Sequence, residues 1–348
     1  MKSLQPEYLA KLSFSAEQMA ALQKVGEHKG KQDLFTEQTP EVLESMKQVA
    51  LIESSESSNR LEGITADYAR VKAMVLRNAT PHDRSEQEIA GYRDALAMIH
   101  ESGEHMTFSE NIILQLHTLI YRYHTSDGGK WKSTNNEIIE KNPDGSIKRV
   151  RFVPTSAVET PASMAALTEG YRESVQQYDP LIVIPLTILD FLCIHPFRDG
   201  NGRVARLLTL MLLYHFDYQV GRYISLERIF EESKETYYET LEASSQQWHE
   251  GEHNVMPWLN YFWGTLIRAY DEFADRVGSI QSGKGSKSEL VRQAVHRRIK
   301  PFAISDIEGD CPGVSRDMIR LVLRQMRDDG LIASTGKGRG AKWYHVKE

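Results

Sequence analysis

Two apolar segments separated by a short polar stretch constrain the fold of this chain more than any other feature. The first, "LIVIPLTILDFLCI", occupies residues 181–194, and the second, "LLTLMLLYHF", occupies residues 207–216. Segments this apolar are typical of buried helices. Between them lies "HPFRDGNGRVAR", residues 195–206. Polar groups inside a core are costly unless a ligand or a partner uses them. We therefore expect a functional loop held between two core helices.

Apolar residues recur three and four positions apart through most of the first 277 residues, which predicts a mainly α-helical body. The segments with this spacing are 40–62, 66–76, 85–101, 108–122, 161–177, 181–194, 203–216 and 256–277. The exception is 135–154, which alternates polar and apolar residues around "NPDG", a strong turn signal. This segment predicts a lone β-hairpin, and because isolated hairpins are marginally stable, we expect it to lie over another part of the body.

The pattern changes after "GSIQSGKGSKS", residues 278–288, which has the composition of a flexible linker. Residues 289–348 then read as a helix, a short second helix, a turn, a third helix and two short strands. The third helix has Ser315 as its expected N-cap and Gly330 at its end. This order predicts a winged helix-turn-helix domain.

Composition excludes several classes of protein. The longest apolar run has 14 residues and contains Pro185 and Asp190, so it is too short to span a membrane. The two cysteines, Cys193 and Cys311, predict neither a disulfide framework nor a zinc site. We expect a cytoplasmic protein without a membrane partner. From Lys284 onward there are 14 basic and 8 acidic residues, whereas the rest of the chain has 28 and 40, so the two parts are expected to meet different partners.

The loop at 195–206 combines groups suited to phosphate chemistry. Glycines around Asn201 let backbone N–H groups approach a ligand, and the start of the following helix favours an anion. Arg203 and Arg206 lie on one helical face, suited to successive phosphates. Asp199 could hold Mg²⁺ between phosphate oxygens. A neutral His195 could accept the proton of a hydroxyl nucleophile. Together these residues predict transfer of a phosphate-containing group.

The same stretch resembles the active-site motif of Fic-domain proteins, H-x-F-x-D/E-G-N-G-R-x-x-R. The matching residues are His195, Phe197, Asp199, Gly200, Asn201, Gly202, Arg203 and Arg206. The resemblance implies a helical Fic fold and the transfer of AMP from ATP to a Ser, Thr or Tyr hydroxyl of a target protein, or of the chain itself. A related phosphotransferase branch, similar to the Doc toxins, has lysine where this chain has Gly202, which favours nucleotidyl transfer here.

The resemblance also implies a role for each motif residue. His195 is the general base and Asp199 binds Mg²⁺. Gly200, Asn201 and Gly202, with the loop amides, hold the α- and β-phosphates. Arg203 pairs with the phosphates, and Arg206 reaches the γ-phosphate. Phe197 is the buried anchor of the loop.

Two flanking segments fit the same resemblance. The hairpin at 135–154 takes the place of a flap on which the target docks as an added strand, with Asn136, Glu137 and Ile138 as the expected docking residues. Further on, "ETYYETL" resembles the helix beside the adenosine, so Tyr237 and Tyr238 are expected near the base, although two such tyrosines also suit a core.

A second motif predicts regulation. "SSNRLEG", residues 57–63, fits the family's inhibitory pattern S/T-x-x-x-E-G/N at Ser58, Glu62 and Gly63. Glu62 would pair with Arg206 and withhold it from the γ-phosphate. Because the motif precedes the core, the resemblance is to the class with an N-terminal inhibitory helix. Glu62 could also position a water for removal of AMP from a modified target.

Two further patterns carry alternatives. "HEGEH", residues 249–253, matches a zinc-protease signature, but Gly251 and the following "NVMP" disfavour the helix that such a site needs. On the third tail helix, Arg316, Arg320, Arg324 and Arg327 form a basic stripe opposite an apolar side that includes Met318, Leu321, Val322 and Met326. With Lys337 and Arg339 at the wing tip, this stripe fits DNA contact, or else a charged face that recruits proteins.

The sequence thus predicts a helical segment at 1–94 with an inhibitory helix at about 50–63, a Fic core at 95–277, a linker at 278–288 and a winged helix at 289–348. The leading function is Mg²⁺-dependent protein adenylylation restrained by Glu62. The alternatives are AMP removal, transfer of another nucleotide such as UMP, and a DNA-binding regulator whose Fic core senses nucleotide. Fic-like proteins often form homodimers, which leaves that state open by analogy.

Overall fold

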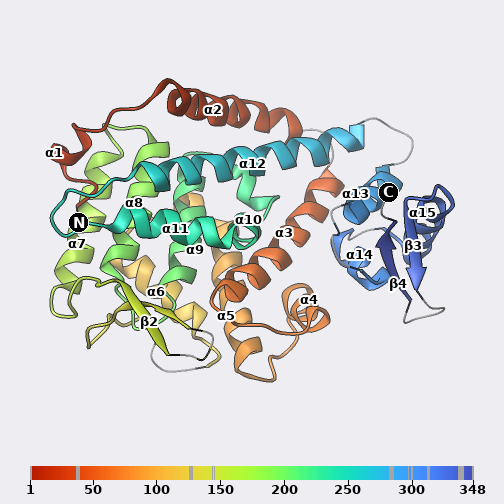
Figure 1. Ribbon diagram of the computed structural model, residues 1–348, viewed down its shortest axis with the longest axis horizontal. Helices are drawn as coiled ribbons and strands as arrows, with labels where there is room; N and C mark the ends of the chain where they lie inside the picture. The colour runs from red at the N-terminus through yellow and green to blue at the C-terminus, as the bar shows by residue number, and fades with distance from the viewer. Residues whose placement is uncertain are drawn as a thin grey trace.

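The computed structural model describes residues 2–36, 40–124, 128–142, 144, 146–281, 286–296, 298, 301–311, 314–335 and 341–346. Figure 1 shows a helical body and a smaller C-terminal tail beside it. The helices of the body are α1 (Pro6–Leu9), α2 (Ala16–Thr36), α3 (Pro40–Leu61), α4 (Tyr68–Arg77), α5 (Arg84–Ser102), α6 (Glu110–Ile120), α7 (Thr160–Ser174), α8 (Pro180–Ile194), α9 (Asn201–His215), α10 (Leu226–Glu232), α11 (Lys234–Ser245) and α12 (Met256–Gln281), with short 3₁₀ turns at Gly103–His105 and Gln219–Arg222.

The centre of the body is the pair α8 and α9, the two apolar segments recognised in the sequence. Helix α8 begins with Pro180, and the Asp179 side chain caps it by accepting a hydrogen bond from the N–H of Leu181. Both helices are buried almost all round, as expected for helices without a polar face. The loop that joins them is therefore anchored at both ends by core packing.

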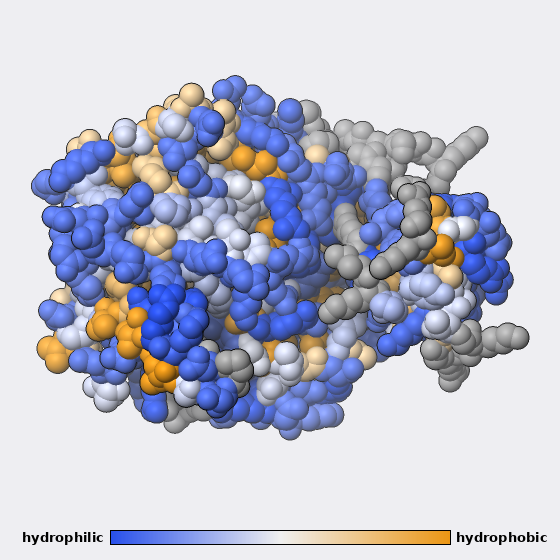
Figure 2. All heavy atoms as spheres, viewed as in Figure 1, coloured by the Kyte–Doolittle hydropathy of each residue, from blue (hydrophilic) through white to orange (hydrophobic). Residues whose placement is uncertain are grey.

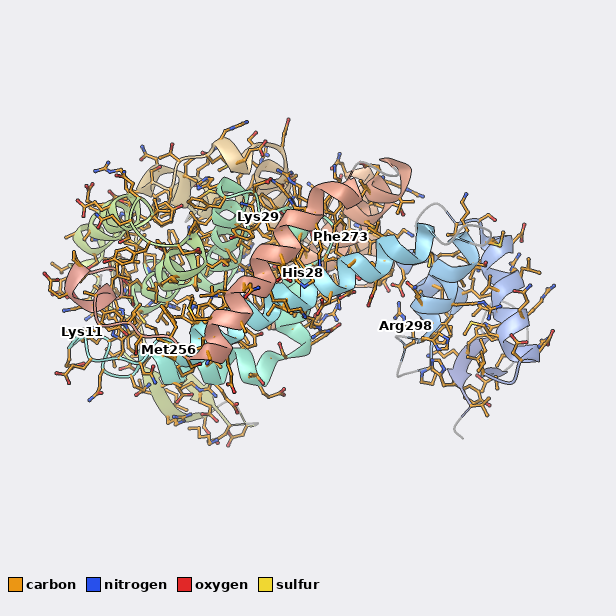
Figure 3. All side chains as sticks on the ribbon, turned by 90° about the horizontal axis from the view of Figure 1, so that it is seen from above. Lys11, His28, Lys29, Met256, Phe273 and Arg298 are labelled. Carbon is orange, nitrogen blue, oxygen red and sulfur yellow. The ribbon has the colours of Figure 1, made fainter. Side chains whose placement is uncertain are left out.

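The N-terminal helices share this core instead of forming a separate unit. Leu4, Val25, Met46 and Leu61 are buried in one cluster with the side chains of α8 and α9. Helix α5 runs through the expected boundary at 94/95, because its apolar positions pack on both sides of that point. In the view from above, α2 lies along α12 with His28 facing it (Figure 3), where the imidazole stacks on Tyr270.

The expected hairpin is present. Strands β1 (Ile138–Lys141) and β2 (Ile147–Phe152) are antiparallel, with irregular register at two points. Arg149 ties the hairpin to α11 through Glu242. Ile147 and Val150 stay exposed, and Figure 2 shows apolar side chains near the hairpin on an otherwise largely hydrophilic face. We call this hairpin the flap.

The tail has its own core and the element order expected for a winged helix. Its elements are α13 (Ser286–His296), α14 (Ile304–Asp310), α15 (Arg316–Asp328), β3 (Ile332–Thr335) and β4 (Lys342–His345). Ser315 caps α15 by accepting a hydrogen bond from the N–H of Met318, as predicted. The expected linker is shorter than 278–288, since α12 continues to Gln281 and α13 starts at Ser286.

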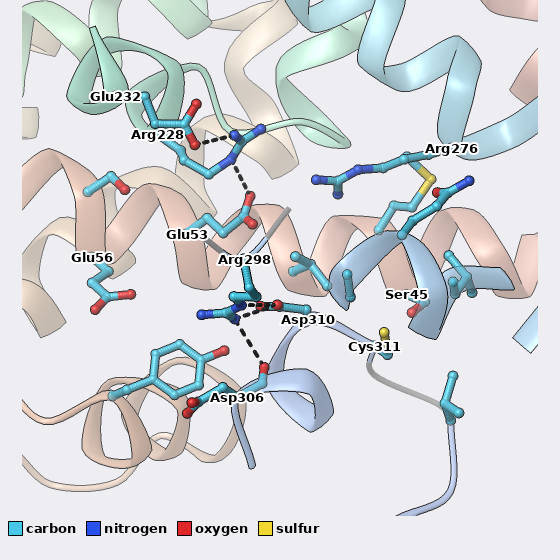
Figure 4. Close-up of a pocket in the computed structure, with 18 of the residues that line it drawn as sticks. Ser45, Glu53, Glu56, Arg228, Glu232, Arg276, Arg298, Asp306, Asp310 and Cys311 are labelled. Carbon is cyan, nitrogen blue, oxygen red and sulfur yellow. Dashed lines mark hydrogen bonds and ion pairs between the residues drawn. The ribbon is translucent and has the colours of Figure 1, made fainter. Parts of the chain in front are cut away.

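The tail packs on the end of α12 and faces α3, the helix that leads to Glu62, across a cavity. A cavity of about 1010 Å³ separates α13 and α14 from α3, α10 and the end of α12. Figure 4 shows charged side chains in its lining, with Arg228 between Glu53 and Glu232, and Arg298 beside Asp310. The tail thus meets the body across a polar and incompletely filled interface.

None of the helices in the described ranges is both long and apolar enough to cross a membrane.

Candidate active site

The loop at 195–206 folds around two residues with left-handed backbone conformation. His195 ends α8 with a φ of 52°, and its N–H donates to the carbonyl of Phe191. Gly200 precedes α9 with a φ of 80°, and a Cβ there would lie 3.1 Å from the Tyr121 ring. Glycine adopts this conformation without strain, whereas for the histidine it costs about 1 kcal/mol. The surrounding contacts must therefore hold His195 in place.

Phe197 and Asn201 close the loop from inside. The Phe197 ring is fully buried and stacks on His117, with ring centroids 3.8 Å apart, so it is the anchor that the sequence predicted. The Asn201 amide donates to the carbonyl of Phe197 at 2.8 Å and accepts from its N–H at 2.9 Å. These two bonds occupy the side chain of Asn201, which is buried. We therefore expect the backbone amides of the loop, and not this side chain, to contact the phosphates.

Arg203 also serves the interior of the protein. Its guanidinium is 0% exposed, contacts Glu88 of α5 at 2.6 Å, and donates to the hydroxyl of Tyr121 at 2.8 Å. A buried arginine paired in this way is already neutralised, although its Nε has no hydrogen-bond partner in the described residues. Arg203 thus fixes the first turn of α9 against α5 and α6. The expectation that it also binds phosphate stays a prediction.

Arg206 and Glu62 make the contact that the sequence predicts. The Nη2 of Arg206 lies 2.8 Å from the Oε1 of Glu62 and also donates to the carbonyl of Ser58, while Nε donates to the Ser58 hydroxyl. Arg206 is 2% exposed, and the Glu62 side chain is 30% exposed. Glu62 directly follows α3, and Gly63 provides the helix end with a φ of 79°.

Glu62 lies over the start of α9. A Cβ on Gly202 would be 2.3 Å from the Oε1 of Glu62 and 3.1 Å from the Nη1 of Arg206. The first N–H groups of a helix have no partner within the helix and attract anions. Nη1 of Arg206 is buried and has no hydrogen-bond partner in the described part of the chain. The carboxylate of Glu62 thus stands where these donors would meet a phosphate.

The His195 ring is held in one tautomer. Its Nδ1 lies 3.2 Å from the carbonyl oxygen of Leu192, and because a carbonyl can only accept, Nδ1 carries the proton. Nε2 is then left with the lone pair that a general base needs. Burial lowers the pKa of His195 to about 4, and the charge of Lys132 acts in the same direction. The imidazole is therefore neutral at pH 7.

Asp199 sits at the open side of the loop. Its side chain is mostly exposed; Oδ1 accepts the N–H of Gly200, and Oδ2 lies 3.7 Å from Arg203. Partial burial opposes its charge, but Arg203 and hydrogen bonds outweigh that effect and hold the pKa of Asp199 below its usual value. A single exposed carboxylate suits Mg²⁺, which keeps waters and takes its other ligands from substrate phosphates.

Several residues outside the motif shape the loop; sequence reasoning missed Lys132, His117 and Asn59, and it assigned Asn136 to target docking instead. Lys132 and Asn136, between α6 and the flap, bond to the backbone of residues 194–197. His117 accepts the N–H of Gly129 and bonds the carbonyl of Asp199. Asn59 of α3 reaches Arg203 at 3.4 Å. None of these lies in the motif, and the one sequence signal that could have pointed to Lys132 and Asn136 is the polar run 132–136, which leads into the hairpin signal.

The expected flap residues separate into different roles. Asn136 turns inward, and its amide donates to Phe197, so it holds the loop and is not free to dock a target. Glu137 is exposed, and Ile138 pairs with Phe152 in the hairpin. Glu137 and Ile138 thus remain available as docking candidates at the inner edge of the flap.

The two tyrosines of α11 also differ. Tyr237 is 3% exposed and packs among Phe230, Trp258 and Tyr261, which makes it a core residue. Tyr238 is partly exposed and its hydroxyl donates to the carbonyl of Leu61 at 3.3 Å. Tyr238 thus offers a partly exposed surface beside the inhibitory segment, whereas the buried Tyr237 approaches Arg206 from the core side.

The arginines of α15 face solvent. Three of them pair with acidic side chains: Arg316 with Glu308, Arg320 with Asp317, and Arg327 with Asp328. Arg324 is exposed without an ion pair in the described residues. Val322 and Met326 are buried as predicted, but Leu321 is 49% exposed because it falls on the arginine side of the helix. Lys337 and Arg339 lie outside the described residues.

The "HEGEH" segment does not form a helix. Its residues fall between α11 and α12, and Gly251 has a φ of 74°. His249 is exposed and bonds the carbonyl of Val153, whereas His253 is buried and bonds the hydroxyl of Ser3. The two imidazoles therefore lack the shared helical face that a zinc-protease site requires.

Comparisons with known proteins agree with this geometry. The model of the Fic/DOC family matches residues 107–213. The protein adenylyltransferase Fic of Nematostella vectensis is 25% identical over 169 residues, which cover 45% of this chain and 36% of that protein. The chain thus spans little more than a third of this relative.

Solved structures show the same fold. A Fic family protein from Desulfovibrio desulfuricans superimposes with a TM-score of 0.63 at 20% identity, covering 97% of this chain and 98% of that one. A Fic domain containing signaling protein from Bacteroides thetaiotaomicron gives a TM-score of 0.59 at 22% identity, with coverage of 75% and 98%. Residues 107–213, which include the loop at 195–206, thus match the Fic/DOC family model, and the chain shares the fold of these solved proteins.

Proposed function

We propose that this protein transfers AMP from ATP to a hydroxyl group of a target protein or of the chain itself. The observation that carries the proposal is the arrangement of three groups around the start of α9. These are a neutral His195 with Nε2 free, the unpaired N–H groups of the first helical turn, and an Arg206 donor without a partner in the described residues. A base beside an anion site is what transfer of a phosphate-containing group requires.

In the proposed reaction, the hydroxyl oxygen attacks the α-phosphorus while its proton passes to Nε2 of His195. The bond between the α-phosphorus and the bridging oxygen breaks, and pyrophosphate leaves. The amides at the start of α9 stabilise charge on the phosphate oxygens, and Arg206 neutralises the γ-phosphate. Asp199 would hold Mg²⁺, which supplies positive charge to the phosphates when bound.

We further propose that the protein is autoinhibited. Glu62 occupies Arg206 and the space above Gly202, so the γ-phosphate lacks its partner while Glu62 is in place. The inhibition depends on a short segment, because Glu62 is the first residue beyond α3 and is partly exposed. Helix α3 itself is fixed to α10 by the buried bond between Ser54 and Glu227. Release therefore needs only movement of the segment around Glu62 and Gly63.

The proposal is tested by incubating the chain with ATP labelled at the α-phosphate and with Mg²⁺. We compare wild type, Glu62→Gly and His195→Ala, with a cell lysate as a source of targets, and read the label on protein. The expected result is strong labelling with Glu62→Gly, little with wild type and none with His195→Ala. Labelling of His195→Ala as strong as that of Glu62→Gly, or no label with any variant, would contradict transfer by this site.

Removal of AMP is a second candidate, favoured by the position of Glu62 over the phosphate-binding end of α9. There its carboxylate could orient a water against an adenylylated hydroxyl. Protein labelled by Glu62→Gly is purified and mixed with unlabelled wild type. Loss of label with wild type but not with Glu62→Gln would support removal, whereas stable label in both would exclude it.

A further inference from the structure

Lys132 binds the loop on both sides of His195. The residue lies between α6 and the flap and is 5% exposed. Its backbone N–H donates to the carbonyl of Pro196 at 2.8 Å. Its ammonium donates to the carbonyl of Ile194 at 3.1 Å. One residue therefore ties down the positions directly before and after His195.

Asn136 extends this hold by one more residue. The Lys132 ammonium donates to Oδ1 of Asn136 at 2.8 Å, and Nδ2 of Asn136 donates to the carbonyl of Phe197 at 3.1 Å. The carbonyls of Ile194, Pro196 and Phe197 thus all accept hydrogen bonds from two side chains and one backbone N–H of this pair of residues. We call Lys132 and Asn136 the clamp.

His195 needs such a clamp because its backbone is left-handed, with a φ of 52°. A residue with a Cβ adopts this conformation only where neighbouring contacts hold it. The segment 195–200 is neither helix nor strand, so no regular hydrogen-bond ladder does so. The clamp bonds act at the point where the conformation is least favourable. They also set the direction in which Nε2 points.

The charge of Lys132 is itself unusual. No carboxylate of the described residues lies within ion-pair distance of its ammonium, and burial lowers the pKa of Lys132 to about 8. It is still charged at pH 7. Around His195, Glu62 and Asp199 favour protonation of the ring, whereas Lys132 opposes it. A neutral side chain could supply the same hydrogen bonds, so the cost of burying a cation points to a use for the charge.

We propose that Lys132 is a positioning residue that fixes the conformation of His195 and keeps its ring neutral, with Nε2 free to take the proton of the attacking hydroxyl. The catalytic part of this inference rests on the proposed transfer of AMP. The part that concerns His195 does not, because the state of the ring can be measured without turnover.

The test uses the full chain with Lys132→Met, Lys132→Arg and, as a matched control, Lys130→Met. Lys130 is exposed, two residues away, and outside the clamp. The His195 ring is titrated by NMR on histidine-labelled protein, with His195→Gln to assign the signal. Each substitution is also made together with Glu62→Gly, and kcat and KM for ATP are measured from labelling rates. Thermal unfolding checks that each variant is folded.

We expect Lys132→Met to move the His195 titration to higher pH and to add the second tautomer. In the Glu62→Gly chain it should lower kcat about 10- to 100-fold, as expected for a misplaced base, with KM for ATP within about twofold. Lys132→Arg should retain most of kcat, and Lys130→Met should behave as its parent. If Lys132→Met does not fold, Asn136→Ala takes its place, because it removes the bond to Phe197. The tautomer of His195 and kcat are then measured on that variant.

An unchanged His195 titration together with an unchanged kcat would overturn the proposal. So would a lower melting temperature without any change in the titration, since that describes a purely structural lysine. If the Glu62→Gly parent transfers no AMP, the proposed function fails, but the NMR titration still decides the role of Lys132.

Discussion

The contact between Glu62 and Arg206 gives a graded prediction for the rate of AMP transfer. We consider the series wild type, Glu62→Gln and Glu62→Gly. The pair is a charge-assisted hydrogen bond of 2.8 Å in which Arg206 is buried and Glu62 is partly exposed. Bonds of this kind contribute about 1.5–3 kcal/mol, and partial exposure places this one toward the lower end. Since 1.4 kcal/mol corresponds to about tenfold, Glu62→Gly should raise the rate about 10- to 30-fold.

Glu62→Gln keeps the shape and can still accept a hydrogen bond from Arg206, but it loses the charge. A neutral bond retains about 1 kcal/mol, so the rate should rise only about fivefold above wild type. The matched control is Glu53→Gln on α3, the helix that leads to Glu62. This change removes an ion pair with Arg228 of α10 and does not affect the contacts of Arg206. It should leave the rate unchanged.

The assay is the initial rate of label transfer from α-labelled ATP at saturating nucleotide, with the melting temperature recorded for each variant. The order wild type, Glu62→Gln, Glu62→Gly is the essential result. If Glu62→Gln were as fast as Glu62→Gly, the inhibition would depend on charge alone and the hydrogen bond would be irrelevant. If all three rates were equal, the pairing would have no inhibitory role.

Three further expectations follow from the same geometry. Because the pKa of His195 is lowered to about 4, the imidazole is neutral above that pH. The transfer rate of the Glu62→Gly chain should therefore stay level between pH 5.5 and 8. A rate that falls to half near pH 6.5 would mean that His195 has the pKa of an unperturbed histidine. Asn201→Ala should lower the free energy of unfolding by about 1–3 kcal/mol, measured by urea denaturation, because it leaves the buried N–H of Phe197 without its acceptor, whereas the Phe197 carbonyl keeps Asn136 as donor. Arg203→Met should cost about 1.5–3 kcal/mol, because the buried carboxylate of Glu88 loses one charged partner and keeps the other, Arg84. Adding Glu88→Gln should recover part of this loss. Weaker ATP binding at unchanged stability would instead support a direct phosphate role for Arg203.

Much of the fold could be predicted from the sequence because it is built from amphipathic and apolar helices. The spacing of apolar residues predicted α3, α5, α8 and α9 to within two residues. It did not predict α2 (Ala16–Thr36). Much of this helix is exposed to solvent where it lies along α12, so its sequence has no strong apolar face. Periodicity also does not reveal that α5 continues across the expected boundary at 94/95 or that residues of the helices before it share one core with α8 and α9.

The site was predicted in part. The motif identified the loop, and the inhibitory pattern brought Glu62 to Arg206 across 144 positions of sequence. The motif could not tell which polar side chains face the ligand and which face the interior. Asn201 and Arg203 are polar residues used for internal bonds, and burial of that kind depends on partners such as Phe197 and Glu88 that come from elsewhere in the chain. Lys132 was missed for the same reason.

The most direct test of the central claim is the intact mass of the Glu62→Gly chain after incubation with ATP and Mg²⁺, together with the identity of the small-molecule product. Transfer of AMP predicts a gain of one or more adenylate groups on the chain and release of pyrophosphate, both abolished by His195→Ala. A gain of a single phosphate with release of ADP would contradict the account. It would mean that the loop presents the γ-phosphate, and not the α-phosphate, to the attacking hydroxyl.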